Sequence, residues 1–166
     1  LQMSKLESGE VAFSHEPLDL NRLSRDILTI VEQRAAEEGV TLEYDREQPE
    51  RVKISSVYGS PLHIRQIFLN IYGNCIKYNK PGGSVKTVCQ YLGNQDGIVT
   101  YRWVIRDTGI GIAPEDRERI FERFVKLDTF TQGTGLGLSI CKSIAEQLGG
   151  SVGVDSVAGE GSCFRI

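Results

Sequence analysis

The chain has 166 residues, 40% of them hydrophobic and 25% charged, which is typical of one globular domain and excludes a disordered chain. The formal net charge of -3 argues against a broad nucleic-acid footprint, which requires a clustered basic excess. No apolar run approaches the roughly 18 residues of a membrane span. The four cysteines contain no C-x-x-C pair and only two histidines accompany them, so we expect buried, reduced thiols of a cytoplasmic domain rather than a zinc site.

The N-terminal third predicts one long helix followed by short strands. Residues 1–10 are polar and end in a break, which is typical of the last turn of a helix. Asp19 can cap a helix whose apolar residues recur at helical spacing until Gly39 ends it. Two strands are predicted next, at residues 40–44 and 52–58.

The middle third predicts a second helix and a strand hairpin. Ser60 and Pro61 are a capping residue and a first-turn proline, so a helix should run from here to about Tyr78. After a short loop, a glycine-containing turn joins two predicted strands, residues 84–92 and 98–106.

The C-terminal third continues the alternation of helices and strands. The predicted elements are a short helix at residues 114–122, a polar loop at 125–135, a long helix at 136–148, and strands at 151–155 and 162–166. Hairpins dominate the strand connections, which favours an α+β fold over a doubly wound parallel sheet. We therefore predict a two-layer sandwich in which three helices cover one face of a mixed, mostly antiparallel sheet.

Polar side chains form a stripe along the second predicted helix. Asn70, Asn74, Lys77 and Tyr78 are spaced so that they share one face of that helix. Asparagine is a poor helix former, but its amide oxygen can bind magnesium, and lysine supplies a point charge for phosphate. A plain solvated helix face is an equally good interpretation of this stripe alone.

Two glycine-rich segments add to the pattern. The segment at residues 107–112, DTGIGI, follows a strand, and its glycines permit close approach of the backbone to a flat ligand. The segment at residues 133–138, GTGLGL, opens the third long helix, where backbone N–H groups and the helix dipole attract an anion. Each segment alone is also compatible with an ordinary turn.

The order of these three elements resembles the GHKL ATPase superfamily and, within it, the catalytic domain of sensor histidine kinases. The resemblance extends over nearly the whole chain, and together the motifs are highly specific. Residues 70–78 resemble the N box, 107–111 the G1 box, 121–124 the F box and 133–138 the G2 box of that family. A departure lies after the N box, where Asn79 and Lys80 replace the usual Thr or Ser.

The resemblance implies ATP and Mg²⁺ as cofactors and assigns roles to individual residues. Asn74 would hold Mg²⁺, Asn70 and Lys77 would act beside the phosphates, and Asp107 would accept a hydrogen bond from the adenine amine. Phe121 and Phe124 would anchor the lid over the nucleotide. The residues implied in ATP binding are Asn70, Asn74, Lys77, Tyr78, Asp107, Gly109, Gly111, Ile112, Phe124, Gly133, Thr134, Gly135, Leu136, Gly137 and Leu138.

Other functions within the superfamily are weighed against the kinase. Its hydrolytic ATPases place a glutamate base one helical turn before the metal-binding Asn, where this chain has Asn70, and an amide cannot take a proton from water. An anti-sigma-factor-type serine kinase and a non-catalytic nucleotide-binding module remain alternatives. Residues 5–9 resemble the end of the dimerisation helix of histidine kinases, which favours the histidine kinase.

The resemblance also implies a division of the chain and a set of partners. Residues 1–14 would end a dimerisation helix and linker, and residues 15–166 would form the ATP-binding catalytic domain. Neither His15 nor His63 has the context of a phosphoacceptor, so we expect that histidine upstream, in a dimerisation domain of the same protein. A response regulator receiver domain would be the next partner. We expect this domain to be a cytoplasmic monomer, and the full-length protein a homodimer anchored in the inner membrane.

Overall fold

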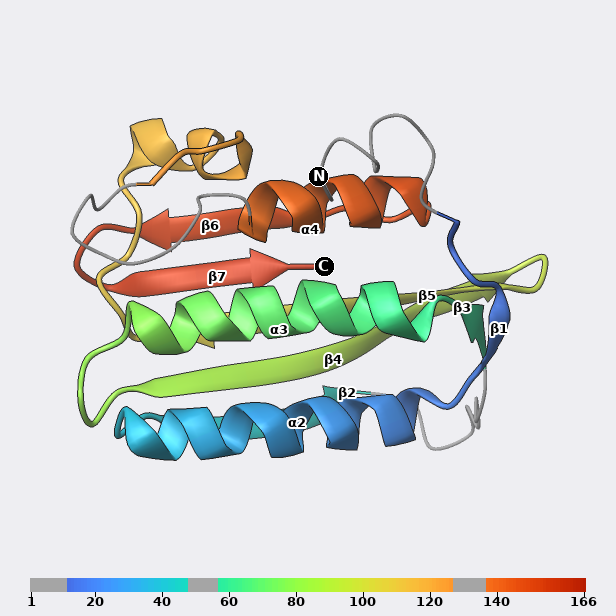
Figure 1. The fold of residues 1–166 in the computed structure, drawn as a ribbon, viewed down its shortest axis with the longest axis horizontal. Coiled ribbons are helices and arrows are strands. Elements are labelled where there is room, and N and C mark those ends of the chain that lie inside the picture. Colours follow the sequence, from blue (N-terminus) through green and yellow to red (C-terminus); the bar gives the residue numbers. More distant parts are fainter. Residues whose placement is uncertain (1–11, 48–56, 127–136) are drawn as a thin grey trace.

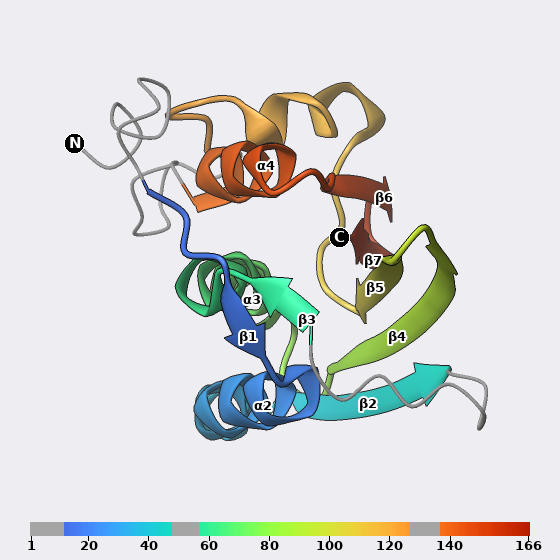
Figure 2. The same ribbon diagram turned by 90° about the vertical axis from the view of Figure 1, so that its right-hand side faces the viewer.

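Helices cover one face of a β-sheet in the computed structural model, which describes residues 12–47, 57–126 and 137–166 (Figures 1 and 2). Within these residues, the helices are α2 (Leu20–Glu37), α3 (Pro61–Lys77) and α4 (Gly137–Gln147). The main sheet of the same residues contains β2 (Thr41–Glu47), β4 (Ser84–Gln95), β5 (Ile98–Asp107), β6 (Gly153–Val157) and β7 (Gly161–Arg165), in the order β2-β4-β5-β7-β6. The pair β2–β4 is parallel and the other pairs are antiparallel. The predicted two-layer α+β sandwich is confirmed.

The helix α2 begins and ends at the residues that its sequence predicts. The Asp19 carboxylate accepts hydrogen bonds from the backbone N–H groups of Asn21 and Arg22, at 2.8 and 3.0 Å. These bonds satisfy donors that would otherwise lack a partner in the first turn. At the other end, Gly39 has a φ of 66°, a conformation that favours glycine after a helix.

The helix α3 begins at Pro61 as predicted, but Ser60 does not cap it through its side chain. The Ser60 hydroxyl instead lies 2.7 Å from Nδ1 of His63, and both residues are buried. His63 is therefore a structural residue, as expected, and burial lowers its pKa.

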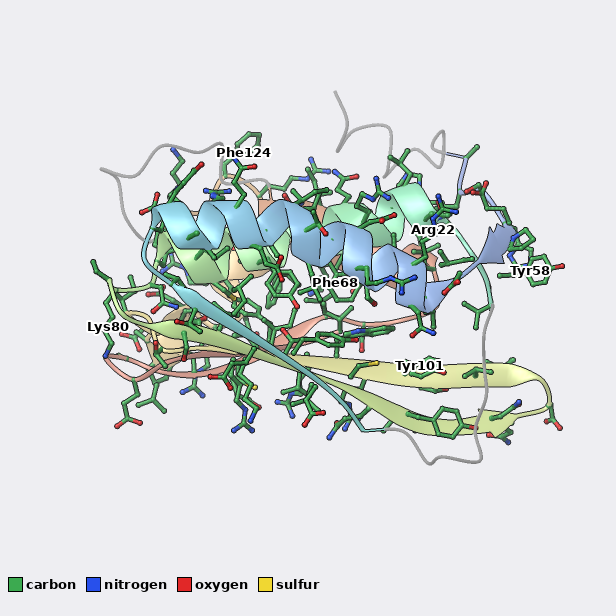
Figure 3. All side chains as sticks on the ribbon, turned by 90° about the horizontal axis from the view of Figure 1, so that it is seen from below. Arg22, Tyr58, Phe68, Lys80, Tyr101 and Phe124 are labelled. Carbon is green, nitrogen blue, oxygen red and sulfur yellow. The ribbon has the colours of Figure 1, made fainter. Side chains whose placement is uncertain are left out.

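The core lies between the helices and the sheet. Its most deeply buried members include Ile71 and Ile76 of α3, Ile144 of α4, and Val85 and Ile105 of the sheet. Figure 3 shows Phe68 and Tyr101 between the two layers. Burial of each aliphatic side chain of this kind stabilises the fold by about 1.5–3 kcal/mol.

The segment predicted as a short helix at residues 114–122 is different in the structure. It forms two 3₁₀ turns, Pro114–Asp116 and Arg119–Phe121. Ile120 is the buried residue of the two turns, which is too little apolar surface to stabilise a regular α-helix.

A small second sheet was missed by the sequence interpretation. The strand β1 (Glu16–Leu18) pairs antiparallel with β3 (Val57–Gly59). The predicted strand at residues 52–58 overlaps β3, but its first part lies outside the described residues. His15 is exposed beside β1, as expected, and stacks on the Tyr58 ring with 5.1 Å between ring centroids.

Most of the cysteines are buried, as the sequence predicts. Cys75, Cys89 and Cys141 are buried, Cys163 is half-buried, and all four, which lie in the described residues, are free thiols. Among the described residues, no helix is both long enough and apolar enough to cross a membrane.

Candidate functional site

The polar stripe predicted on the second helix is present on α3. Asn70, Asn74 and Lys77 are half-buried, whereas Ile71 and Cys75 on the opposite side of the helix are buried in the core. The stripe is therefore presented to the surface by a helix that the core holds rigidly.

Two members of this face differ in how they are held. The Lys77 ammonium lies 5.0 Å from the centroid of the Tyr78 ring, a cation–π contact that orients the lysine. Within the described parts of the chain, no hydrogen bond involves the Asn74 carboxamide. Its oxygen is therefore available to a ligand.

Asn70 connects the stripe to the beginning of α4. Its side-chain nitrogen donates a hydrogen bond to the Gly137 carbonyl oxygen at 3.4 Å, across 67 positions of sequence. A second contact joins the Asn70 side chain to the Cys141 thiol. Burial raises the pKa of this thiol to about 12. The N-box-like helix α3 and the first residue of α4 are thus in contact.

The turn after β5 lies against the C-terminal end of α3. The Ile110 N–H donates to the Tyr78 carbonyl oxygen at 3.1 Å, and a Cβ at Gly109 would overlap that same oxygen. Gly111 has a φ of 70°, and a Cβ there would overlap the Val157 carbonyl oxygen. These two glycines therefore permit close approach to the protein's own backbone, a role that the sequence interpretation did not anticipate.

Asp107 lies at the end of β5, where several donors converge on its carboxylate. One oxygen accepts hydrogen bonds from the Gly109 N–H at 2.9 Å and the Ser162 N–H at 3.2 Å, and the buried Cys75 thiol makes a third contact. Burial raises the pKa of Asp107 from its ordinary value, and these hydrogen bonds oppose the rise. The carboxylate is thus held in one orientation beside α3.

A buried serine pair supports Asp107 from the β6–β7 hairpin. The Ser156 hydroxyl accepts a hydrogen bond from the Ile112 N–H at 2.7 Å and donates to the Gly161 carbonyl oxygen at 2.8 Å. It also lies 3.0 Å from the Ser162 hydroxyl. The sequence interpretation missed both serines, since nothing in their spacing predicts a role.

Asn79, the departure after the N box, has a structural role. Its side-chain nitrogen donates to the Ser84 carbonyl oxygen at 3.0 Å, and its oxygen accepts from the Thr108 hydroxyl at 3.1 Å. The Thr108 hydroxyl in turn accepts a hydrogen bond from the Ser84 N–H at 2.9 Å. This cluster ties the loop after α3 to the turn that follows Asp107.

The remaining predicted site residues have mixed outcomes. Phe121 packs against the core, whereas Phe124 is 72% exposed and has a φ of 61°. The lid-anchoring role of both residues stays a prediction, because residues 127–136 lie outside the described part of the chain. The Ile112 side chain lies in the core, and Leu138 packs against the core from α4. Gly133, Thr134, Gly135 and Leu136 lie outside the described residues.

The described residues contain no group of three or more His, Cys, Asp or Glu side chains that could hold a metal ion by themselves. A site for Mg²⁺ can instead combine one protein oxygen with phosphate oxygens and water, which is the usual pattern for magnesium with nucleotides. The half-buried Asn74 carboxamide, whose oxygen accepts no hydrogen bond from the described residues, fits that requirement.

Replacing Ser156 with alanine should lower the free energy of unfolding by about 1–3 kcal/mol, because the buried Ile112 N–H would lose its acceptor. Urea unfolding of the variant and the wild type measures the difference. Ser151→Ala, an exposed serine just before β6, is the control and should change stability by less than about 0.5 kcal/mol. Equal stability of the two variants would show that the Ser156 network does not stabilise the site.

Comparisons with known proteins agree with this geometry. Residues 59–166 match the family described as histidine kinase-, DNA gyrase B-, and HSP90-like ATPase. The sensor histidine kinase GacS of Pseudomonas protegens is 38% identical over 173 residues, which cover 100% of this chain and 18% of GacS. The chain thus spans less than a fifth of that relative.

Solved structures show the same fold. Full-length ShkA in complex with AMPPNP superimposes with a TM-score of 0.82 at 32% identity, covering 98% of this chain and 32% of ShkA. The histidine kinase ThkA in complex with the response regulator protein TrrA has a TM-score of 0.74 at 21% identity, a similarity of fold that covers 99% of this chain and 45% of ThkA. With its family match over more than half of its length, the chain belongs to the histidine kinase-, DNA gyrase B-, and HSP90-like ATPases.

Proposed function

We propose that this domain binds ATP with Mg²⁺ and transfers the γ-phosphoryl group to a histidine in a dimerisation domain of the same protein, for relay to an aspartate of a response regulator. The observation that carries the proposal is the contact of Asn70 with Gly137, which brings the polar stripe of α3 to the first residue of α4. The amide and ammonium groups of the stripe and the N-terminal end of α4 can therefore face the same phosphates. The AMPPNP in the ShkA complex supports ATP as the nucleotide.

The residues would divide the work of binding and transfer. Asn74 would bind Mg²⁺, which neutralises phosphate charge when bound, and Lys77 and Asn70 would orient the phosphates. Asp107 would accept a hydrogen bond from the adenine amine, which selects adenine over guanine. In the transfer step, a ring nitrogen of the acceptor histidine forms a bond to the γ-phosphorus as the bond to the β–γ bridging oxygen breaks and ADP leaves. Catalysis then rests on positioning and charge neutralisation.

The kinase is favoured over a hydrolytic ATPase because the helix lacks a base at the required position. The Asn70 carboxamide cannot accept a proton from water at neutral pH, and its nitrogen is already directed at the Gly137 carbonyl oxygen. A serine kinase or a nucleotide-binding module of the same superfamily would share the nucleotide site, so the acceptor of the phosphoryl group separates these functions.

The proposal extends to the parts of the protein around this domain. Residues 1–14 would be the end of a dimerisation helix and linker, and residues 15–166 the catalytic domain. The domain alone would be monomeric and the whole protein a homodimer anchored in the inner membrane. The TrrA complex of ThkA supports a response regulator as the next partner.

The domain alone should neither label itself nor release phosphate rapidly when incubated with γ-labelled ATP and Mg²⁺. His15 stacks on Tyr58 beside β1, and His63 is buried, so neither is placed to receive a phosphoryl group. Addition of a separate dimerisation domain with its histidine should produce an acid-labile label on that domain. Label on His15, label on a serine, or fast phosphate release without an acceptor would each contradict the proposed function.

A further inference from the structure

The face of the sheet away from the helices carries cations on its central strands. Side chains alternate between the two faces of a strand. Val85 of β4 and Ile105 of β5 are buried on the helix side, so the residues next to them along each strand point to the open face. On β4 and β5 these open-face residues include Lys86, Arg102 and Arg106, and all three are exposed. Figure 3 shows side chains that end in nitrogen below the sheet, opposite the helices.

The strand register brings these cations close together. Arg106 lies directly opposite Lys86 on β4, and Arg165 of β7 lies opposite Val104, the next open-face residue of β5. We call Lys86, Arg102, Arg106 and Arg165 the basic strip. Like charges directly opposite each other destabilise a sheet. Arg165 pairs with Asp155, but no ion pair joins the other three cations to a carboxylate of the described residues.

The edges of the sheet limit the width of the basic strip. Glu43 and Asp45 of β2 are exposed on one side, and Asp155 of β6 is exposed on the other. Between them lie the three adjacent strands β4, β5 and β7, which span roughly 10 Å from the first to the third. The half-buried Val88 and Val104 lie opposite each other in the middle and provide an apolar floor.

We propose that the basic strip is a docking surface for an acidic α-helix of another protein. The strip is about as wide as an α-helix, whose diameter with side chains is about 10–12 Å. Carboxylates on such a helix would pair with Lys86, Arg102 and Arg106, which form no ion pair with the described residues. Its apolar residues would cover the two valines. The carboxylates of β2 repel an acidic partner that is displaced toward that edge, so they limit where the helix can lie.

The surface does not suit a nucleic acid, and it is separate from the nucleotide site. The aromatic rings of the central strand β5, Tyr101 and Trp103, pack toward Phe68 on the helix side, so they cannot stack with bases on the open face. Asp107 contacts Cys75 of α3, which also lies on the helix side. A partner on the basic strip therefore leaves access to the nucleotide free and can hold this domain in place during signalling.

A labelled amphipathic peptide of about 20 residues, with glutamates along one face around a leucine row, is a suitable probe because it is long enough to form a helix. Its binding to the 166-residue chain, followed by fluorescence anisotropy, should weaken as salt is raised from about 50 mM to about 300 mM. The double variant Lys86→Glu and Arg102→Glu should bind the peptide at least about tenfold more weakly. The neutral pair Lys86→Gln and Arg102→Gln should show a smaller loss.

The matched control is Arg22→Glu with Arg25→Glu, which makes the same change in net charge on the exposed face of α2 (Figure 3). This control should bind the peptide within about twofold of the wild type, and all variants should keep the wild-type affinity for ATP, which shows that they fold. An equal loss in the control, no peptide binding to the wild type, or equally tight binding of duplex DNA of similar charge would overturn the proposal.

Discussion

Replacement of Asn74 with alanine should abolish phosphoryl transfer in the full-length protein. The change removes the amide oxygen that we propose as the magnesium ligand, and loss of a metal contact costs several kcal/mol of transition-state stabilisation. Since about 1.4 kcal/mol corresponds to a factor of ten in rate, transfer should fall at least about 100-fold. The rate of labelling of the acceptor histidine measures the effect. In the isolated domain, the ATP affinity of the variant should no longer depend on Mg²⁺.

The fold should survive this substitution. The Asn74 carboxamide makes no hydrogen bond within the described residues, and alanine has a higher helix propensity than asparagine. The thermal midpoint should therefore stay the same or rise slightly. Asn94→Ala, near the end of β4, where the Asn94 side-chain oxygen accepts from the Gly97 N–H, is the control and should leave transfer unchanged. Transfer at the wild-type rate by Asn74→Ala would exclude Asn74 as the metal ligand.

Replacement of Gly161 with alanine should have the largest effect on stability. Gly161 begins β7 with a φ of 105°, which is strained for alanine, and a Cβ there would overlap the backbone carbonyl oxygen of Asp107. The conformational strain costs about 1–3 kcal/mol and the overlap a similar amount, so the free energy of unfolding should fall by roughly 3 kcal/mol or more. Urea unfolding measures this loss. ATP affinity should also fall, because Asp107 would be displaced from α3.

Gly159 offers a close control in the same hairpin. It has a φ of 84°, but a Cβ there would meet no atom within 4 Å. Gly159→Ala should therefore cost only the conformational strain, about 1 kcal/mol, and should leave ATP affinity near that of the wild type. If both variants lost the same stability and affinity, the close contact between β7 and Asp107 would have no special importance.

Local signals in the sequence predicted most of the secondary structure. Asp19 and Pro61 mark the beginnings of α2 and α3, and Gly39 marks the end of α2, because capping and φ restriction act within a few residues. The 3₁₀ turns near Ile120 were missed, because their conformation depends on how few of their side chains are buried against the core, which the sequence does not show. The pairing of β1 with β3 was also missed, because strand pairing between distant residues leaves no local pattern.

The candidate site was predicted as a set of residues but not as a network. The spacing of Asn70 and Asn74 placed them correctly on one face of α3. Sequence could not show that Asn70 contacts Gly137, or that Ser162 donates to Asp107, because these pairs are joined only by tertiary packing. The approach of Gly111 to a ligand stays a prediction, and the close approach of Gly111 to the Val157 carbonyl oxygen is one that the sequence did not indicate.

The most direct test of the account is calorimetric titration of this domain with ATP in the presence of Mg²⁺, compared with GTP and with the variant Asp107→Asn. The wild type should bind ATP saturably and prefer it to GTP. Asp107→Asn keeps an oxygen to accept from the Gly109 and Ser162 N–H groups, but it weakens a charge-assisted hydrogen bond to adenine worth roughly 1.5–3 kcal/mol. Its ATP affinity should therefore fall at least about tenfold, since each 1.4 kcal/mol is a factor of ten. The absence of saturable ATP binding to the wild type at millimolar concentration, or equal affinity of the variant, would contradict the account.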